Sequence, residues 1–337
     1  MSAINISGKD LISTQDWSLE ELKFVIESAK EIKRMKYLGN VPELFKNKTM
    51  FMLFYNTSTR TRSSFESAAT LLGGHAQFID FKTTRGSEGE SIADTAHMYE
   101  RLGHVLGIRI LEEAVDYVYG AGDALIREYA KHANIPVINM ADDMYHPTQA
   151  IADMLTIDEK LQGNYKNKKY VISWAYSNHV RSWGSVQDEM LIASKFGMHV
   201  VLAYPQGFDL DERIVDQARA NAEAAGTELE IMHDMGSALD GADVVFPRSW
   251  ASHACVTSGM NRFGSDNEVK LHEQYKDWRL TQKLVDRMSS NAIITHVLPV
   301  FRGQEADNEV MDSTRSVIYD QAENLLYVRA ALLALLA

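Results

Sequence analysis

The feature that most constrains the fold of this chain is a regular alternation of short apolar runs with longer stretches of helical periodicity. The run at 49–55, TMFMLFY, is continuously apolar, which is typical of a strand buried on both faces of a parallel sheet. A polar turn and a helical pattern at 63–72 follow it, and the same order recurs along the chain. Because parallel strands need a crossover between them, this alternation predicts helices packed on parallel sheets.

The same patterns place most of the other elements. A helix is expected over 18–37, because Ser18 and Glu21 form a capping-box pair and apolar residues then recur at helical spacing. Further helices are expected at 92–102, 123–132, 147–161 and 186–196, and further strands at 76–81, 105–109, 136–140, 169–174, 199–204, 228–232, 242–246 and 292–296. The predicted fold class is therefore α/β, with two doubly wound parallel-sheet domains and an interdomain active-site cleft, since ligands of such sheets bind beyond the carboxyl ends of the strands.

Composition limits the class of partner. The 337 residues suffice for about two domains, and 34 basic against 46 acidic side chains give a net charge of −12, which disfavours nucleic acid and anionic membranes. The single cysteine, Cys255, excludes an internal disulfide and a cysteine-rich metal site. The first residues do not resemble a secretory signal, and the apolar stretch at 330–337 is far shorter than a membrane span. We therefore expect a cytoplasmic protein.

The most specific local pattern is Ser58-Thr59-Arg60-Thr61-Arg62, which lies between the first predicted strand and a helix. Free backbone N–H groups and the dipole at a helix N-terminus favour an anion. The hydroxyl and guanidinium groups sharpen that preference toward phosphate. The alternative for such a cluster is a simple helix cap with solvated arginines.

Other strand ends carry chemistry that complements a phosphate site. Arg109 ends the predicted strand VLGIR, and the segment 146–149, HPTQ, places an imidazole and a carboxamide between a strand and a helix. The segment 296–299, HVLP, follows the predicted strand AIITH. Loops from both halves of the chain therefore supply matching groups.

These motifs make the chain similar to the aspartate/ornithine carbamoyltransferase superfamily, whose carbamoyl phosphate motifs STRTR and HPTQ stand at 58–62 and 146–149. The resemblance covers essentially the whole chain. It includes the GIR arginine at 109, GESIADT at 89–95, which looks like the family's mobile loop, the HxLP turn at 296–299 and the segment at 321–336. The resemblance implies a carbamoyl phosphate-binding domain over 1–157, completed by a C-terminal helix over 322–337, and an amine-binding domain over 158–321.

Within the superfamily, the chain looks most like the branch that contains N-acetylornithine carbamoyltransferase. The segments that carry this likeness are STQDWS at 13–18, PVINM at 136–140, LDER at 210–213 and ADVVFPRSWAS at 242–252. That branch has a knotted second domain, so the resemblance also implies a knot here. It further implies a homo-oligomer, expected to be a trimer, with active sites shared between subunits.

Transfer of a carbamoyl group to an amine requires a neutralised leaving phosphate, a polarised carbonyl and a held carbamoyl NH2. Preorganised donors aimed at the carbonyl oxygen stabilise its growing negative charge, and the reaction needs no metal, cofactor or covalent nucleophile. The family motifs assign catalysis to Arg60, Arg109, His146 and Gln149. They assign carbamoyl phosphate binding to Ser58, Thr59, Arg60, Thr61, Arg109, His146, Gln149 and Leu298.

The chain departs from its relatives in the mobile loop. The aspartate enzymes carry a lysine there that reaches a neighbouring subunit's site, and the matching residue here is Glu88. Ser87 could still donate to phosphate from the neighbouring subunit, or Arg85 could take the place of the lysine. Arg62 is expected to brace the phosphate loop through Glu66 rather than to touch the ligand.

A second departure concerns the amine. Ornithine enzymes carry a cysteine where this chain has Val297, and an aspartate with an SMG loop where it has Arg248-Ser249-Trp250. A guanidinium in place of a carboxylate favours an acceptor with a carboxylate or an acyl-blocked nitrogen. The alternative is that Arg248 forms a salt bridge within the protein. The residues expected to bind the amine are Arg248, Ser249, Trp250, Arg181, Val297 and Arg302.

The resulting hypothesis is a carbamoyltransferase that moves the carbamoyl group from carbamoyl phosphate to a small carboxylate-bearing amine, such as an N-acylated ornithine. The products would be a ureido compound and phosphate. The alternatives are an ornithine or aspartate carbamoyltransferase, or a noncatalytic paralogue that only binds carbamoyl phosphate.

Overall fold

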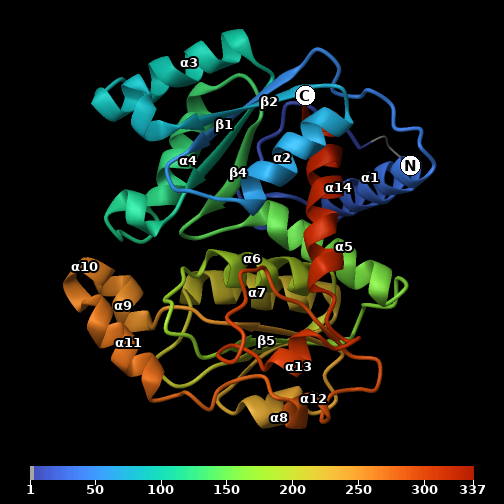
Figure 1. Ribbon diagram of the computed structural model, residues 1–337, viewed down its shortest axis with the longest axis vertical. Coiled ribbons are helices and arrows are strands. Elements are labelled where there is room, and N and C mark those ends of the chain that lie inside the picture. The colour runs from blue at the N-terminus through green and yellow to red at the C-terminus, as the bar shows by residue number, and fades with distance from the viewer. Residues whose placement is uncertain (1–3) are drawn as a thin grey trace. The chain divides into compact units, whose positions relative to one another are not determined.

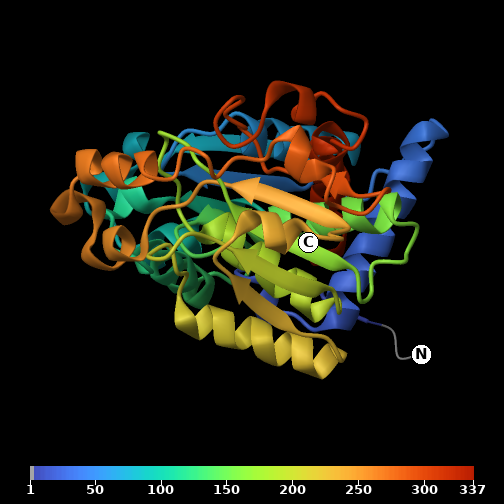
Figure 2. The same ribbon diagram turned by 90° about the horizontal axis from the view of Figure 1, so that it is seen from below.

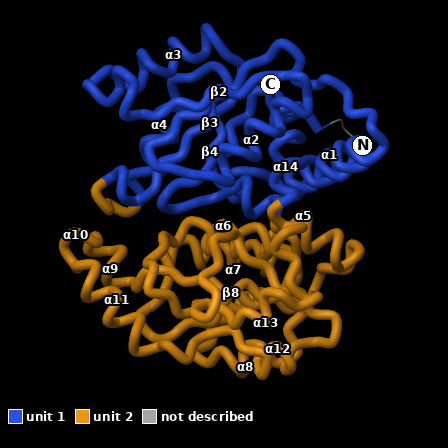
Figure 3. Tube along the Cα trace, in the orientation of Figure 1, with its two compact units in different colours: residues 1–115, 120–152, 323–337 blue, residues 116–119, 153–322 orange. Residues whose placement is uncertain are grey.

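Each half of the chain builds one parallel sheet, as the alternation predicts. The computed structural model describes residues 4–337 and divides into two units (Figure 3). Unit 1 contains the residues up to Val115, Gly120–Ala152 and Glu323–Ala337, and unit 2 contains Asp116–Tyr119 and Asp153–Ala322.

The sheet of unit 1 has four parallel strands in the order β2-β1-β3-β4. The strands are β1 (Thr49–Phe54), β2 (His75–Asp80), β3 (Val105–Ile110) and β4 (Val137–Asp142). The central strands β1 and β3 are almost wholly buried, which explains their continuously apolar sequences. The pairing of β3 with β4 shifts register between Ile108 and Arg109, so the strand is irregular where the predicted site arginine lies.

Helices cover this sheet. They are α1 (Leu19–Tyr37), α2 (Arg60–Leu71), α3 (Ile92–Leu102) and α4 (Ala121–His132), with short 3-10 helices at Thr14–Asp16, Phe81–Thr83, Arg85–Glu88 and Glu112–Val115. Ala96 and Tyr99 of α3 and Ile126 and Tyr129 of α4 pack with strand residues in one core cluster. The capping box of Ser18 and Glu21 is present at the start of α1.

Two helices contribute residues to both units, α5 (Pro147–Lys160) and α14 (Ile318–Leu336). The unit 1 part of α14 lies beside α1 (Figure 1), where Lys33 Nζ donates to Asn324 Oδ1 at 2.8 Å and Lys36 Nζ donates to the hydroxyl of Tyr327 at 3.2 Å. The C-terminal segment therefore completes the first unit, although it follows the second in sequence.

The sheet of unit 2 has five parallel strands in the order β7-β6-β5-β8-β9, and they run in one direction in Figure 2. The strands are β5 (Lys169–Trp174), β6 (His199–Ala203), β7 (Leu229–Met232), β8 (Val244–Arg248) and β9 (Ile293–Ile294). The helices are α6 (Gly184–Lys195), α7 (Glu212–Ala225), α8 (Met235–Leu239), α9 (His253–Ser258), α10 (Met260–Phe263), α11 (Ser265–Glu273), α12 (Gln282–Val285) and α13 (Asn308–Met311).

Several boundaries differ from the sequence expectations. Helix α2 begins at Arg60 rather than at residue 63, so three of the residues of the STRTR segment form its first turn. Strand β8 ends at Arg248, which the sequence had placed in a loop. The helix α7 was not anticipated, and β9 is only two residues long. No helix among residues 4–337 combines the length and the apolar character that are needed to cross a membrane.

Candidate active site

The connection from β1 to α2 has the geometry of an anion site. The hydroxyl of Ser58 accepts from the backbone N–H of Thr61 at 3.3 Å, while Thr59, which precedes the helix, makes no side-chain cap of its own. Arg60 is exposed at the first helical position, and Thr61 is buried. The helix N-terminus therefore carries a hydroxyl and a guanidinium beside its backbone N–H groups, which is the environment that phosphate prefers.

Arg62 makes local contacts instead of contributing its guanidinium to the anion site. Its Nε donates to Glu66 Oε1 at 2.9 Å, and its guanidinium lies 4.0 Å from the ring centroid of Phe78. This is the i,i+4 bracing contact that the sequence predicts.

Arg109 lies at the carboxyl end of β3, the strand that pairs with β1. Burial lowers the pKa of Arg109 to about 10; the carboxylates of Glu112 and Glu113 oppose that shift and the charge of Arg60 adds to it. The Nε atom of Arg109 is buried and has no hydrogen-bond partner among residues 4–337. Arg60 and Arg109 therefore lie within electrostatic range of each other, and one anion would stabilise both charges.

Glu112, on the 3-10 helix that follows β3, was not anticipated. Burial raises the pKa of Glu112 to about 7, and the nearby carboxylates of Glu113 and Asp143 add to that effect while Arg109 opposes it. Its Oε2 atom is buried and has no hydrogen-bond partner among the described residues. Glu112 can therefore change its charge near neutral pH close to Arg109.

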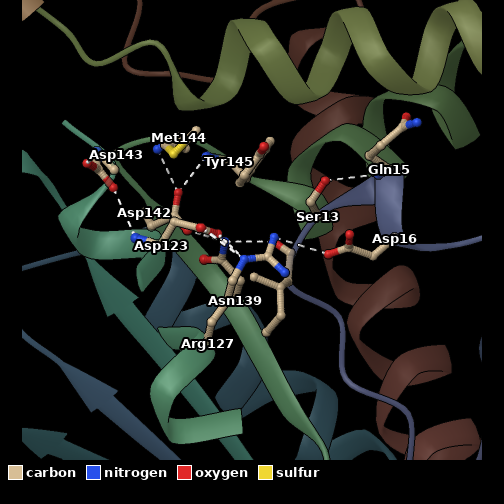
Figure 4. Close-up of polar contacts among 12 residues, drawn as sticks. Ser13, Gln15, Asp16, Asp123, Arg127, Asn139, Asp142, Asp143, Met144 and Tyr145 are labelled. Atoms are coloured by element: carbon tan, nitrogen blue, oxygen red, sulfur yellow. Dashed lines mark hydrogen bonds and ion pairs between the residues drawn. The ribbon is translucent and has the colours of Figure 1, made fainter. Parts of the chain in front are cut away.

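The loop that delivers His146 to the start of α5 is held by Asp142 (Figure 4). Its Oδ1 atom accepts from the backbone N–H groups of Met144, at 2.7 Å, and Tyr145, at 2.5 Å, and its Oδ2 accepts from Asn139 Nδ2 at 2.8 Å. Burial raises the pKa of Asp142 well above its usual range. The backbone immediately before His146 is therefore fixed by one buried carboxyl group.

Asp143 ties the same loop to α4. Its carboxylate accepts from the backbone N–H groups of Gly120, at 2.5 Å, and Asp123, at 3.2 Å, and so caps that helix. Asp123 in turn pairs with Arg127, whose Nη2 lies 3.3 Å from Asp16 Oδ2 (Figure 4).

Gln149, on the first turn of α5, is buried, whereas His146 is partly exposed. The four predicted catalytic residues all follow parallel strands of unit 1: Arg109 lies at the carboxyl end of β3, Arg60 and Gln149 lie in the first turns of α2 and α5, and His146 immediately precedes α5.

Unit 2 builds a second cluster around Arg248, the last residue of β8. Its Nη1 atom lies 3.8 Å from Glu305 Oε1, and both side chains are almost completely buried. Glu305 also accepts from the backbone N–H groups of Ser249, at 3.0 Å, and Phe301, at 2.8 Å. Arg248 therefore forms an intramolecular ion pair, which is the alternative that the sequence leaves open, and its partner, Glu305, lies outside the sequence motifs.

His296 completes this cluster. Its Nε2 atom lies 3.4 Å from Glu305 Oε2, and its Nδ1 accepts from the backbone N–H of Leu298 at 2.9 Å. Burial lowers the pKa of His296; Glu305 opposes the shift, and the charges of Arg248 and Arg181 add to it. Burial alone would raise the pKa of Glu305, but His296, Arg248 and the N–H of Phe301 hold it at about 2. The cluster thus contains two arginines and one carboxylate, together with a histidine whose neutral form is favoured.

The remaining predicted amine-site residues differ in exposure. Arg181 lies 5.0 Å from the ring centroid of Phe301, and the partly buried Val297 and Leu298 follow His296. Arg302 pairs with Asp312 at 2.7 Å. Ser249 and Trp250 have no exposed surface, and the Trp250 indole N–H donates to the carbonyl of Phe208 at 2.8 Å. Arg248, Arg181 and the turn at 296–299 therefore share one neighbourhood, whereas Trp250 packs in the core.

The residues just before the expected mobile loop at 89–95 form the 3-10 helix Arg85–Glu88, and α3 begins within that segment, at Ile92. Ser87 Oγ donates to the carbonyl of Thr84 at 2.6 Å, and Arg85 pairs with Glu88 within the same turn. Both residues that were considered as replacements for the missing lysine are therefore engaged locally in this chain.

One group of described residues has donors suited to a metal ion. The ligand atoms of His199, Glu228 and Glu230 lie within 4.8 Å of one another, and His199 Nε2 is 2.9 Å from Glu230 Oε1. His199 is the first residue of β6, at the opposite end of the strand from the candidate site. These residues take no part in that site.

Comparison with known proteins decides the family. Residues 9–159 match the carbamoyl-P binding domain, and residues 166–336 the Asp/Orn binding domain, of aspartate/ornithine carbamoyltransferases. The chain belongs to the aspartate/ornithine carbamoyltransferase family. Its fold, reaction class and motifs agree with the resemblance seen in the sequence, and the protein is a carbamoyltransferase.

Individual relatives of this carbamoyltransferase fall into two groups. The anabolic ornithine carbamoyltransferase of Pyrococcus furiosus is 35% identical over 334 residues, covering 98% of this chain and 97% of the relative. The N-acetylornithine carbamoyltransferase of Xanthomonas campestris pv. campestris is 34% identical over 346 residues, covering 98% of each chain. The two identities are nearly equal, so overall similarity does not distinguish the acceptors.

Solved structures similar to this chain also include both ornithine and N-acetylornithine enzymes. The ornithine carbamoyltransferase from Pyrococcus furiosus has a TM-score of 0.85 at 33% identity, and covers 99% of this carbamoyltransferase and 98% of that chain. An N-acetyl-L-ornithine transcarbamylase has a TM-score of 0.88 at 31% identity, and covers 98% of this chain and 100% of that chain.

Proposed function

We propose that this carbamoyltransferase transfers the carbamoyl group of carbamoyl phosphate to the amino group of a small, carboxylate-bearing amine, such as an N-acylated ornithine. The domain over 1–157, completed by 322–337, would bind carbamoyl phosphate, and the domain over 158–321 would bind the amine.

The observation that supports this choice of acceptor is the set of charged side chains around Arg248. The guanidinium groups of Arg248 and Arg181 both act on buried His296, whose neutral form is favoured, and Glu305 is the carboxylate that pairs with Arg248.

The two guanidinium groups select among acceptors. Free ornithine carries an α-ammonium group that an N-acylated ornithine lacks; a guanidinium repels an ammonium group, whereas it attracts a carboxylate and can form charge-assisted hydrogen bonds with it. Glu305 is already engaged by two backbone N–H groups and His296, so it supports the arginines more than it competes with a ligand. An acceptor with a carboxylate and a masked α-amino group therefore fits this cluster best.

In the proposed reaction, the uncharged amine nitrogen attacks the carbonyl carbon of carbamoyl phosphate and a C–N bond forms. The C–O bond to phosphate then breaks, phosphate leaves with the bonding electrons, and the nitrogen releases a proton. Ser58, Thr59, Arg60 and the α2 N-terminus would hold the phosphate, and Arg109, Thr61 and His146 would donate to the carbonyl oxygen as its charge grows. Gln149 and the Leu298 carbonyl would accept from the carbamoyl NH2.

The test is a carbamoyl phosphate-dependent assay for ureido products over a panel of amines: ornithine, N-acetylornithine, N-succinylornithine, aspartate, lysine and putrescine. We expect the highest kcat/KM with an N-acylated ornithine. Robust turnover of free ornithine or putrescine would refute the proposed acceptor if the protein turns over no acidic amine with a masked α-amino group.

An Arg60→Ala variant serves as the control for the phosphate assignment. It removes a charged group from an exposed helix position, so the fold should be retained while carbamoyl phosphate-dependent turnover falls at least a hundredfold. A variant with unchanged kcat/KM would show that the phosphate binds elsewhere.

A further inference from the structure

Arg329, on α14, is a buried arginine that forms no ion pair with any residue in the described part of the chain. Its side chain is 1% exposed. Among residues 4–337, its guanidinium donates only to neutral oxygens: the carbonyl of Thr61 at 3.3 Å, the hydroxyl of Ser64, and the hydroxyl of Thr148 at 3.3 Å. The guanidinium carbon lies 4.4 Å from the ring centroid of Phe65.

Such a position is unfavourable for a charge. Removing a guanidinium from water without a counter-ion costs several kcal/mol, and buried arginines are usually paired with a carboxylate. Burial, together with the charge of Arg109, lowers the pKa of Arg329 to about 9, so Arg329 still carries its proton at neutral pH. The same charge would be stabilised whenever an anion binds near Arg109.

The partners of Arg329 belong to both motifs of the phosphate site. Thr61 and Ser64 lie in the first turns of α2, shortly after Ser58, and Thr148 is the second residue of α5, directly after His146 and Pro147. One guanidinium therefore links the helix that presents phosphate donors to the helix that follows the histidine. Its fork of donors suits this task because it can reach several acceptors at once.

We propose that Arg329 is a positioning residue for the phosphate site, which holds the first turns of α2 and α5 together and adds a positive charge within electrostatic range of Arg109. This inference rests on the proposed function, in which these turns bind the phosphate of carbamoyl phosphate. Arg329 contacts the ligand through neither its backbone nor its side chain, and it acts through Thr61, Thr148 and the local potential.

The test measures binding of inorganic phosphate and of carbamoyl phosphate by calorimetry to the full-length protein and to three variants of this residue. Arg329→Met removes the charge and the donors, Arg329→Gln removes the charge but retains a donor, and Arg329→Lys retains the charge. We expect Kd for phosphate to rise at least tenfold in the methionine and glutamine variants, and the lysine variant to stay within about threefold of the parent. Arg101→Gln, at a side chain that is 83% exposed on α3, is the matched control and should bind phosphate as the parent does.

Thermal melting and circular dichroism of each variant identify those that fold. If the methionine variant does not fold, the glutamine variant carries the comparison, because its amide can still donate to Thr61 or Thr148. A structural role alone would lower the melting temperature and leave Kd unchanged, and this result in a folded neutral variant would overturn the inference. A lysine variant as weak as the methionine variant would also overturn it, because the charge would then have no part in binding.

Steady-state kinetics provide an independent readout. Loss of the charge should raise KM for carbamoyl phosphate more than it raises KM for the amine. If the parent protein itself binds neither phosphate nor carbamoyl phosphate, the proposed function fails. If the parent binds both and the neutral variants bind equally well, only the inference about Arg329 fails.

Discussion

Individual buried arginines in this protein are stabilised in different ways. Within the described residues, Arg248 has a carboxylate at 3.8 Å, Arg109 has Glu112 within electrostatic range but not as an ion pair, and Arg329 donates to neutral oxygens only. A guanidinium without a close counter-ion remains available to attract an anion, whereas a paired one is partly neutralised. The residues beside each arginine therefore tune its strength as an anion ligand.

The first prediction at the residue scale concerns Glu112, whose pKa is raised from 4.5 to about 7. The folded state keeps this proton to higher pH than the unfolded chain, so the free energy of unfolding should fall as pH rises from 4.5 to 7. Glu112→Gln should remove about 3 kcal/mol of that decline, which is the free-energy equivalent of the pKa shift. Urea denaturation of parent and variant at several pH values measures it; parallel pH profiles for the two proteins would contradict the assignment.

The second prediction concerns Glu305, whose pKa is lowered to about 2. Its carboxylate stabilises the fold above pH 4.5, and that contribution should be lost as pH falls toward 2. Glu305→Gln should lower the free energy of unfolding by about 3 kcal/mol at pH 7, because Arg248 loses its buried partner. Chemical denaturation at pH 7 and pH 3.5 checks this; an effect that grows at the lower pH would rule out the proposed pairing. Asp312→Asn, which affects the exposed pair with Arg302, is the control and should cost less than 1 kcal/mol.

At the scale of elements, both candidate clusters depend on how a strand connects to the next helix. The carboxyl ends of parallel strands meet at one edge of a sheet, and short polar loops there present side chains in fixed directions. The loop from β4 to α5 shows this clearly, because one buried aspartate, Asp142, binds the N–H groups of the residues just before His146 (Figure 4).

Asp142→Ala should therefore lower kcat more than it raises KM for either substrate. The loop loses three hydrogen bonds, and His146 is no longer held where it can donate to the carbonyl oxygen, so we expect a fall in kcat of about tenfold or more. Steady-state kinetics, with circular dichroism as a check on folding, provide the measurement. Asp16→Asn, at the outer end of the same polar network, is the control and should leave kcat unchanged. A folded Asp142→Ala variant with parental kcat would show that the loop does not depend on this carboxyl group.

At the scale of the whole molecule, the net charge of −12 coexists with local clusters of arginine, so the charge total alone gives no information about the ligand. We expect the active form to be a homotrimer in which Ser87 reaches the site of a neighbouring subunit. Sedimentation should give three times the 37.9 kDa mass of the chain. A fully active monomer would contradict this expectation.

Subunit mixing tests the shared site directly. Arg60→Ala and Ser87→Ala proteins, each with reduced activity, should regain activity when they are dissociated and reassembled together. A mixed interface would combine an intact Arg60 from one subunit with an intact Ser87 from its neighbour. Activity that equals the average of the two separate proteins would exclude a shared site.

The sequence by itself determined the elements and the reaction class. Apolar periodicity and helix caps are local properties, so the strands of both sheets and helices such as α1 could be predicted within a few residues. The motifs at 58–62 and 146–149 combine several residues whose chemistry is needed together, and they therefore identified the family and predict where phosphate binds. The start of α2 and the length of β9 were misjudged, because boundaries depend on tertiary hydrogen bonds as well as on propensity.

Only the tertiary structure decided which distant groups meet. Glu305 binds Ser249 from 56 residues away, and Arg329 reaches Thr61 across 268 residues, so no local pattern could pair them. Burial and the charges around a carboxyl group together determine whether it is ionised, as the opposite pKa shifts of the buried Glu112 and Glu305 show. Long-range pairing and desolvation are properties of the folded chain as a whole, and in this protein they determine the surroundings of each buried arginine.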